Sequence, residues 1–492
     1  PATAIKNYPT SFNIALRGLS ERILNSGESC QDTLRHPSAG PLVIILLQVL
    51  VVSAHFYGDD HNDELKTGDV PTFASDSAAQ ALVHRILGWD DEEKSRDIIF
   101  SLSSNSTASH FMETVLKTAN DDFHEKITER AFLGYLPKFC ENGVANFVIQ
   151  ALLMTSRNKS QALKLGEEIM PIFGEILHSR KGIIWRLSEV CSKYRILQHE
   201  LHEKLCENVK KSESKLTIVE CVPILMAFHP AEEEGGKITL DANGCRIIMN
   251  LLRFSPKLCE PVLDGIMINF PADELIEVAK DPLGSRCIID GILDGNTKDG
   301  AFQKNVKKLL KLLEGNWSRL AVHRVGQHSV KKIFKRLVSM NDKAALVAEL
   351  AQNKAKLSGN NMGRSVMESC AVQEFLEGES AWKTRVAQMA RMETLLSDVI
   401  SGDGGGGGKK RKRKRKKTGD DADQAGEDQI VSDDKDLDEP AESNADSTKE
   451  TYTVTDGKAN NKSTSVEAVL DILDGANATK KKRKRRRKAK TV

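Results

Sequence analysis

A nine-residue stretch, Ala145–Leu153, recurs in weaker form along the chain and limits the folds that are open to it. On a helix that turns by about 100° per residue, Asn146 and Gln150 share one face, and the aliphatic side chains lie on the opposite face. The aliphatic face predicts packing into a core. The other face offers two amides one turn apart, which can bond the edge of a nucleobase. The ring of Phe147 beside them can stack on the face of that base.

Related stretches follow one another at a nearly constant interval. They begin at Ala108, Gly244, Gly284 and Gly326, with poorer copies at Ala39, Gly182 and Met362. Most successive copies start 37 to 42 residues apart, whereas two gaps are longer, at 62 and 69 residues. Each long gap requires either an insertion or a unit too degenerate to see. A recurrent interval of this length predicts a solenoid of helical units, each too small to bury its own apolar face.

The length and composition favour the same fold class. The chain has 492 residues, of which 40% are hydrophobic and 5% are aromatic. A body of about 400 residues is too long for one globular core, and a stacked array avoids that limit. We therefore expect an all-α array over residues 1–400, with loop insertions at 57–80 and 230–236. Residues 401–492 are too polar to bury a core and predict a disordered tail.

Charge is concentrated in the tail. Residues 401–492 hold 23 Lys and Arg and 18 Asp and Glu, so the tail is basic and the body has a net charge of −3. Two dense basic blocks, at 409–417 and 480–488, predict binding to import receptors. Within the body, residues 301–337 contain ten Lys and Arg and a single acid. That stretch predicts a local surface for phosphates.

Several observations restrict the compartment. The nine cysteines form no CxxC pair, so we expect reduced thiols in a nuclear or cytosolic protein. The most apolar run, residues 42–52, is shorter than the roughly 20 residues of a membrane span, so no membrane partner is expected. Because the chain begins at Pro1 rather than at Met, we expect that its natural N-terminus lies further upstream.

Motifs of catalysis are not recognisable. His199 and His202 are too close together for the HExxH spacing of a zinc protease. Gly408 and Lys409 follow a glycine run, but no Ser or Thr comes next and no strand precedes them, so they do not make a phosphate loop. We expect no enzymatic activity, no metal and no cofactor.

The repeated stretches differ in what their polar face offers. A helix that only packs would also show a small residue before an apolar stripe. It would not require Asn146 with Gln150, or Ser109 with Glu113, and these pairs favour contact with base edges. The other copies offer fewer hydrogen bonds at the same two positions, and there packing is an equal or better interpretation. They carry Cys245 and Met249, Ser285 and Ile289, and Ile183 and Leu187.

A planar side chain follows the first of these positions in several copies. The planar residues are His110, Phe147, Arg286 and His328. Each of them can stack on a base. A single histidine is more often a cap or a core residue, but four planar groups at one register position favour a binding role.

Asn146–Gln150 resembles the RNA-reading helix of Pumilio (PUF) repeats. The segments 281–286, 325–330 and 357–364 further resemble the C-terminal half of the nucleolar protein nine family of Pumilio-repeat proteins. The resemblance implies a curved solenoid of three-helix repeats that binds RNA on its concave face. It also implies that Asn146 with Gln150 reads uracil and that Ser109 with Glu113 reads guanine.

The same resemblance implies a set of RNA-contacting residues. They are Ser109, His110, Glu113, Asn146, Phe147, Gln150, Arg246, Ser285, Arg286, Gln327, His328, Lys331 and Arg364. Leu187, Met249, Ile289 and Lys331 depart from the base-reading pattern. These departures favour a protein that binds partly through the RNA backbone and its shape.

The function that follows is binding of pre-ribosomal RNA, single-stranded or partly structured, in the nucleolus. The resemblance implies a role in small-subunit rRNA processing, with pre-ribosomal proteins as further partners. A nucleolar Pumilio relative that serves another ribosomal subunit, or DNA, fits the same residues. The main alternative is an armadillo- or HEAT-like nuclear scaffold that binds protein, which the acidic balance of the body supports. The two alternatives differ in whether the repeated helices line the concave face.

Overall fold

The computed structural model describes residues 10–25, 30–57, 71–210, 215–229, 238–295 and 300–400. The segment expected to be a disordered tail lies outside this part of the chain. Residues 1–407 form one compact unit. Its described residues form helices joined by short connections, with one isolated antiparallel bridge between His229 and Thr239. The prediction of an all-α body is confirmed.

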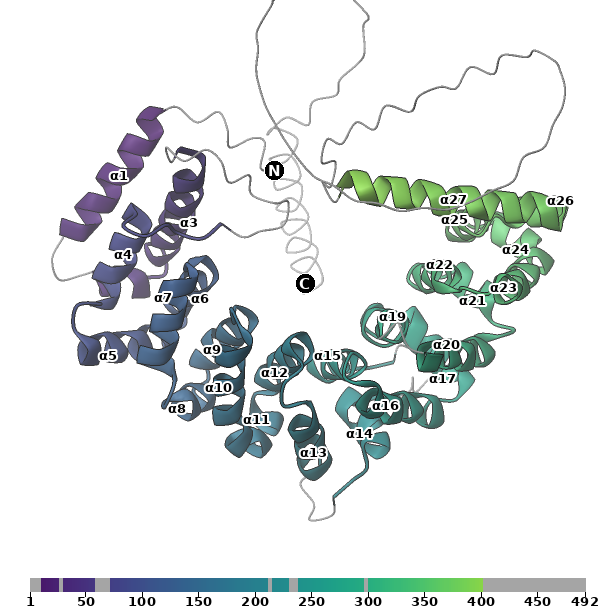
Figure 1. Ribbon diagram of the computed structural model, residues 1–492, viewed down its shortest axis with the longest axis horizontal. Helices are drawn as coiled ribbons and strands as arrows, with labels where there is room; N and C mark the ends of the chain where they lie inside the picture. The colour runs from purple at the N-terminus through teal and green to yellow at the C-terminus, as the bar shows by residue number, and fades with distance from the viewer. Residues whose placement is uncertain are drawn as a thin grey trace, which may run out of the picture. The chain divides into compact units, whose positions relative to one another are not determined.

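One row of helices lies on the inner side of the arc that this unit follows, and we call it the inner row (Figure 1). Each member contacts the next member of the row. The inner row comprises α3 (Gly40–Tyr57), α6 (Ser109–Thr118), α9 (Ala145–Met154), α12 (Lys181–Tyr194), α15 (Ala242–Leu251), the continuous run of α18 (Pro282–Gly284), η4 (Ser285–Ile289) and α19 (Asp290–Asp294), α22 (Gly326–Arg336) and α25 (Asn361–Ser369).

Two helices, in places extended by a π or 3-10 turn, connect each inner helix to the next. They are α4 (Ala78–Leu87) and α5 (Glu92–Ser103); α7 (Asp121–Ile127), η2 (Thr128–Phe132) and α8 (Leu136–Glu141); α10 (Lys159–Ile169), η3 (Met170–Ile172) and α11 (Phe173–Ser179); α13 (Gln198–Asn208) and α14 (Ile218–Met226); α16 (Pro256–Asn269) and α17 (Ala272–Lys280); α20 (Gly300–Leu313) and α21 (Trp317–Ala321); α23 (Met340–Gln352) and α24 (Lys354–Ser358). Each repeat therefore has three helices, as the sequence resemblance implied.

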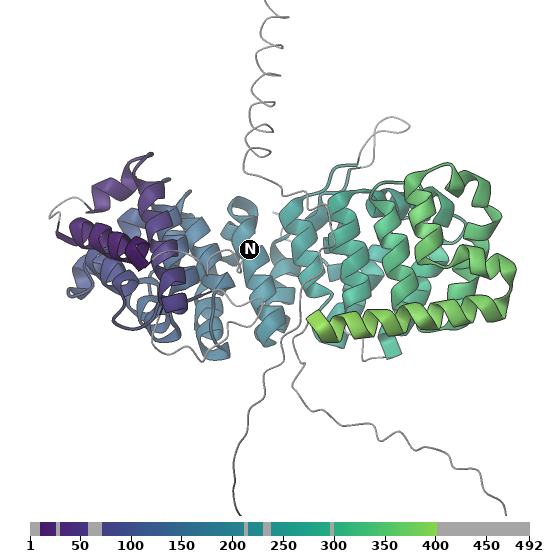
Figure 2. The same cartoon turned by 90° about the horizontal axis from the view of Figure 1, so that it is seen from above.

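Further helices lie at the two ends of the array. They are α1 (Thr10–Asn25) and α2 (Cys30–Arg35) at one end, and α26 (Val372–Glu377) and α27 (Glu379–Ile400) at the other. Figure 2 shows α27 running across its neighbours along one edge of the array. Trp382 of α27 is fully buried, and its indole N–H donates to the carbonyl oxygen of Cys370.

The two long gaps between sequence copies are insertions. In the structure α12 contacts α15 directly, and α3 contacts α6 directly, so neither gap holds a hidden unit of the inner row. The loop that we expected over residues 57–80 ends before residue 80. Phe73 is fully buried and its N–H donates to Thr118, and α4 already begins at Ala78. Residues 230–236 lie outside the described chain, between the paired residues His229 and Thr239.

A short polar side chain caps most of the inner helices. In α9 the Asn142 Oδ1 accepts from the backbone N–H of Val144 and of Ala145, at 2.9 Å each. Asn105, Asp241, Asp281, His323 and Asn360 cap their helices in the same way. Such caps satisfy the N–H groups that a helix start leaves free. The recurrent caps explain why these copies begin at a fixed distance from an Asn, Asp or His.

The small residue that marks most copies allows the inner helix to approach the preceding helix closely. A Cβ atom placed on Gly244 would lie 1.7 Å from the carbonyl oxygen of Leu225. At Gly284 and Gly363 the corresponding distances to a backbone oxygen are 2.4 and 2.5 Å. Because backbone atoms cannot move aside easily, these positions require glycine.

Two expectations about the whole body can be compared with the structure. No helix of the described residues has both the length and the apolar character needed to cross a membrane. All nine cysteines are outside disulfide bonds, and most are buried. Burial raises the pKa of Cys191 and Cys370 to about 12. These two thiols are therefore unreactive at neutral pH.

Candidate nucleic-acid interface

The inner row exposes one stripe of side chains per helix. The planar residues predicted to stack, His110, Phe147, Arg286 and His328, are all exposed, and Phe147 has 54% of its surface accessible. Arg364 is exposed as well, and Arg246 is half-buried. These side chains come from α6, α9, α15, η4, α22 and α25, and these helices lie in this order along the inner row (Figure 1). The stripe provides planar and cationic groups at a regular spacing.

The residues predicted to come first in each base-reading pair are buried. They are Ser109, Asn146, Ser285 and Gln327, each with less than a tenth of its surface exposed. On an α-helix a position next to the exposed stripe turns partly towards the neighbouring helix. The structure therefore buries these side chains, whereas the planar residues that follow them are exposed to solvent.

Asn146 already uses its hydrogen-bonding capacity within α9. Its Nδ2 donates to the carbonyl oxygens of Asn142 and Gly143, and its Oδ1 accepts from the Nε2 of Gln150 at 3.0 Å. The other Nε2 hydrogen and the Oε1 of Gln150 have no protein partner in the described chain. In this arrangement Gln150 is the group available to a base, and Asn146 holds it in position.

The pair predicted to read guanine has a similar arrangement. Ser109 is buried, whereas Glu113 is partly exposed. The Glu113 carboxylate lies 3.1 Å from the Nδ1 of His110 and 3.4 Å from the Nζ of Lys117. A carboxylate can accept the two N–H donors of a guanine edge, and here two neighbouring side chains hold it on the surface.

The unit that contains α12 differs from its neighbours. Ile183 and Leu187 are fully buried, which confirms that these two positions serve packing. Trp185 is half-buried, and two guanidinium groups lie over its ring. The guanidinium carbon of Arg186 is 3.9 Å from the ring centroid, and that of Arg246 is 4.2 Å away. Stacking on a tryptophan face fixes an arginine in place without neutralising its charge.

An open pocket of ≈ 490 Å³ lies between α9, α12 and α15. It is lined by Gly143, Asn146, Phe147, Gln150, Ser179, Arg180, Lys181, Gly182, Trp185, Asn243 and Arg246. Four of the predicted residues meet in it, since Asn146, Phe147, Gln150 and Arg246 all contribute. The pocket thus brings an aromatic ring, amides and cations together on the inner row.

Sequence reasoning missed Arg180, Lys181, Trp185 and Asn243, which line the same pocket. Trp185 is half-buried and lies three positions after the marker Gly182, one position beyond the register of the planar residues in the other copies, so the repeat pattern did not indicate it. Lys181 is held by Asp241, with its Nζ 2.6 Å from a carboxylate oxygen. Burial acts to raise the pKa of Asp241, but the bond from Lys181 and two backbone N–H groups hold that pKa below its usual value.

A π-turn shifts the helical register of the copy that begins at Gly284. Residues 285–289 form η4, and Ile289, expected at the second reading position, is fully buried. Asp290 is half-buried in its place, and the extra residue of a π-turn explains the shift. The Oγ of Ser285 lies 2.8 Å from the Oγ of Ser329, so Ser285 joins two inner helices. Arg286 keeps the exposed position expected for it.

The lysines of α22, namely Lys331, Lys332 and Lys335, form what we call the α22 lysine cluster. Each already has a polar partner. Lys331 donates to Gln327 and Ser365, Lys332 pairs with Asp290 and Asp294, and Lys335 pairs with Glu393. Their attraction for phosphate is therefore partly offset by protein groups.

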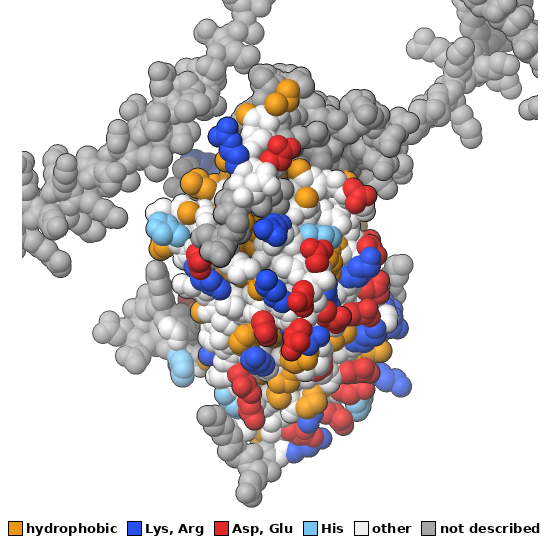
Figure 3. Space-filling view, turned by 90° about the vertical axis from the view of Figure 1, so that its left-hand side faces the viewer, with side chains coloured by type: hydrophobic (Ala, Val, Ile, Leu, Met, Phe, Trp, Pro, Cys, Tyr) orange, Lys and Arg blue, Asp and Glu red, His pale blue; other side chains and the backbone are white. Residues whose placement is uncertain are grey.

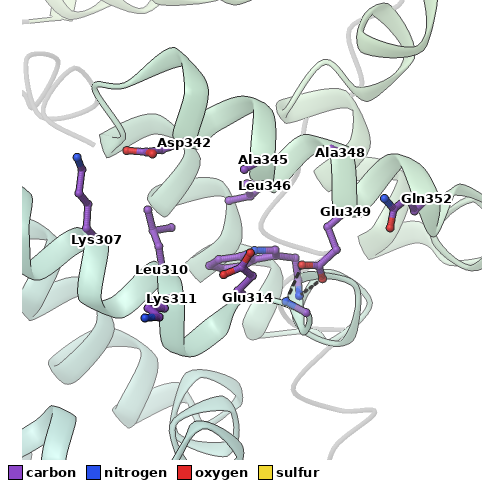
Figure 4. Close-up of a pocket in the computed structure, with 12 residues that line it drawn as sticks. Lys307, Leu310, Lys311, Glu314, Asp342, Ala345, Leu346, Ala348, Glu349 and Gln352 are labelled. Carbon is purple, nitrogen blue, oxygen red and sulfur yellow. Dashed lines mark hydrogen bonds between the residues drawn. The ribbon is translucent and has the colours of Figure 1, made fainter.

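The basic stretch 301–337 is divided between two faces of the array. His328 and the α22 lysine cluster belong to the inner row, whereas Lys307 and Lys311 belong to α20. These two lysines line a separate pocket of ≈ 680 Å³ between α20 and α23, where Glu349 accepts from the N–H groups of Gly315 and Trp317 (Figure 4). The stretch is therefore not one continuous surface for phosphates, contrary to its appearance in the sequence.

The surface at the N-terminal end carries both signs of charge, in agreement with the small net charge of the body. Figure 3 shows Lys and Arg intermixed with Asp and Glu on this face. Many of these charges form ion pairs between neighbouring residues or repeats, such as Lys164 with Glu129 at 2.9 Å. Exposed pairs of this kind contribute little to stability. The face shown in Figure 3 has no large basic area that would bind nucleic acid irrespective of its sequence.

Comparison with known proteins identifies the repeats. Residues 1–365 match the model of the NOP9-like PUF repeat domain. Pumilio homolog 23 of Arabidopsis thaliana is 26% identical over 61% of this chain and 39% of its own length. Nucleolar protein 9 of Mus musculus is 23% identical over 60% of this chain and 49% of its own length. The chain thus spans about two fifths to one half of these curated relatives.

A solved structure described as APUM23-GGAGUUGACGG shares the fold. It aligns with a TM-score of 0.57 at 18% identity and covers 78% of this chain and 81% of that chain. The inner row, the three-helix repeats and the matched residues lead to one assignment. The chain belongs to the family of NOP9-like PUF repeat proteins, which is a family of RNA-binding repeats rather than of enzymes.

Proposed function

We propose that the chain binds pre-ribosomal RNA along its inner row and acts in small-subunit rRNA processing in the nucleolus. The observation that carries this proposal is the pocket between α9, α12 and α15. There an exposed aromatic ring, a free glutamine amide and arginine guanidinium groups converge on one surface. Stacking platforms, edge donors and cations are the groups by which proteins recognise single-stranded RNA.

Base reading in this proposal rests on a small part of the array. Gln150 beside Phe147 provides a preference for uracil, and Glu113 beside His110 provides a preference for guanine. Units such as that of α12 have buried apolar side chains at the reading positions and contribute contacts to the RNA backbone and shape. The RNA sequence is therefore recognised at some repeats and tolerated at others.

The relatives named nucleolar protein 9 support nucleolar placement and a role in ribosome biogenesis. Pre-ribosomal proteins are further proposed partners, and import receptors would recognise the basic blocks at 409–417 and 480–488. Removal of residues 401–492 is expected to disperse the protein from the nucleolus and to leave base preference unchanged. Fluorescence localisation of the truncated protein tests this division, and full nucleolar retention would contradict it.

Crosslinking of the full chain to RNA in cells, followed by sequencing of the crosslinked sites, tests the function. We expect crosslinks in pre-rRNA of the small subunit, and peptides that carry the crosslink should come from α6, α9 and α15. Crosslinks confined to the outer helices would contradict binding along the inner row. The family match to PUF repeats favours RNA binding over the armadillo-like alternative.

A further inference from the structure

The pocket between α9, α12 and α15 holds two arginines whose charge no described acid balances. Arg246 forms no ion pair or hydrogen bond in the described chain and rests on the ring of Trp185. Arg180 donates to backbone oxygens, those of Ser179 and Glu141. Both side chains line the pocket. The site therefore contains uncompensated positive charge that is partly shielded from solvent.

The other cations near the pocket are neutralised. Lys181 pairs with Asp241 at 2.6 Å, and Arg186 pairs with Glu189 at 2.6 Å. Arg186 also lies over the ring of Trp185, so two guanidinium groups rather than a base occupy the indole. The indole instead positions Arg246, and the exposed ring of Phe147 is left as the stacking surface of this pocket.

We propose that this pocket binds one nucleotide of RNA in two separate halves. The base lies against Phe147 and Gln150, and the phosphate lies between Arg180 and Arg246. This inference rests on the proposed binding of RNA by the inner row. It assigns Trp185 a new role as a positioning residue for the phosphate half.

The unpaired guanidinium of Arg246 suits a phosphate ligand. Its carbon lies 4.2 Å from the ring centroid of Trp185, and the hydrogen bonds that a guanidinium donates come from N–H groups in its plane. An in-plane pair of N–H donors matches two oxygens of a phosphate. The edge of a guanine presents a similar pair of acceptors, but it is neutral. Two uncompensated arginines in one pocket favour the anion.

The dimensions of the pocket agree with this division. A volume of ≈ 490 Å³ lies within the range of roughly 300–1,000 Å³ that is usual for small-ligand sites. Phe147 and Arg246 line the same pocket from α9 and α15, on either side of α12. A nucleotide bound across α12 would therefore reach both halves, although α12 itself offers no base-reading side chain.

The test is binding of the full-length protein to a random-sequence RNA pool at several salt concentrations. Replacement of Arg246 by Gln should lower affinity about tenfold at low salt, as expected for the loss of a charged hydrogen bond. The slope of log affinity against log salt should decrease by about 0.7, the contribution of one phosphate on a single strand. The base preferences of the RNA selected from the pool should not change.

Three further variants separate the effect of the Arg246 charge from the effect of its position. Arg246→Lys keeps the charge and should retain most of the salt slope. Trp185→Leu removes the stacking surface and should lower the slope in the same direction as Arg246→Gln, whereas Trp185→Phe should not. Arg96→Gln is the matched control, because Arg96 lies 4.8 Å from the ring centroid of Tyr135 but belongs to α5 on the outer side.

Each outcome has one meaning. If Arg246→Gln removes the preference for one base and leaves the salt slope unchanged, Arg246 reads a base edge and the proposal is wrong. If it changes neither quantity while the wild-type protein binds RNA, the phosphate passes elsewhere, and binding by the inner row still stands. If the wild-type protein binds no RNA from the pool, the proposed function itself fails.

Discussion

Replacing Gly182 by Ala should remove base reading by Gln150 without a direct change to either RNA-facing side chain. A Cβ atom on Gly182 would lie 2.9 Å from both the Nε2 and the Oε1 of Gln150. Contacts this short force a shift, and the atoms that move are the flexible end of the glutamine. The amide then leaves Asn146, from which it now lies 3.0 Å away.

We expect Gly182→Ala to change the stability of the protein little and its base discrimination more strongly. Ala is favoured over Gly inside a helix by about 1 kcal/mol, whereas loss of the Gln150–Asn146 bond costs about 0.5–1.5 kcal/mol. The two terms nearly cancel, so the free energy of unfolding should change by less than about 1 kcal/mol. Discrimination at the base that Gln150 contacts should fall by about 1–3 kcal/mol, as for other losses of a side-chain contact to a base edge.

The assay compares the binding of two RNAs that differ at one uracil, for the wild-type protein and for Gly182→Ala, Gln150→Ala and the double variant. The double variant should discriminate no worse than Gln150→Ala, because both changes act on the same contact. Gly18→Ala in α1 is the control, since no described atom outside the surrounding backbone of α1 lies within 4 Å of its added Cβ. Fully additive losses in the double variant would refute the reasoning.

Three other predictions concern stability and salt. Burial, with a smaller contribution from Arg157, lowers the pKa of His124 from its ordinary value of 6.5 to about 3. Between these two pH values His124 is protonated in the unfolded chain and neutral in the folded chain. The free energy of unfolding should therefore fall by about 2 kcal/mol between pH 6.5 and 5, and His124→Gln should abolish this loss in pH-dependent denaturation. Gly244→Ala should destabilise by about 1–3 kcal/mol because its Cβ meets the Leu225 carbonyl, and an unchanged melting temperature would contradict this. Replacing the α22 lysine cluster by Gln should reduce the salt slope for RNA by less than about 0.7 in total, and a decrease near 2 would show that these lysines do contact phosphates.

The sequence was sufficient to predict the helical repeat, because the repeat depends on local sequence patterns. A small residue followed by an apolar stripe, at intervals of about 40 residues, implies a helix that needs a neighbour to cover it. The caps at Asn142 and Asp281 depend on residues three positions away, and the exposed planar residues depend on the helical period. Such features involve neighbouring positions of one chain segment, so they can be predicted without knowledge of the fold.

The side chains that share a pocket were decided by the tertiary structure. Trp185 and Arg246 are separated by an insertion in the sequence, and they meet because α12 packs directly against α15. The division of the basic stretch has the same origin, since α20 and α22 are close together in the chain but lie on different sides of the array. Acidic partners from other repeats, such as Asp294 for Lys332, offset part of the positive charge of this stretch. The sequence determined which helices form and which faces they expose, whereas contacts between repeats determined which exposed groups act together, because those contacts depend on how whole helices pack.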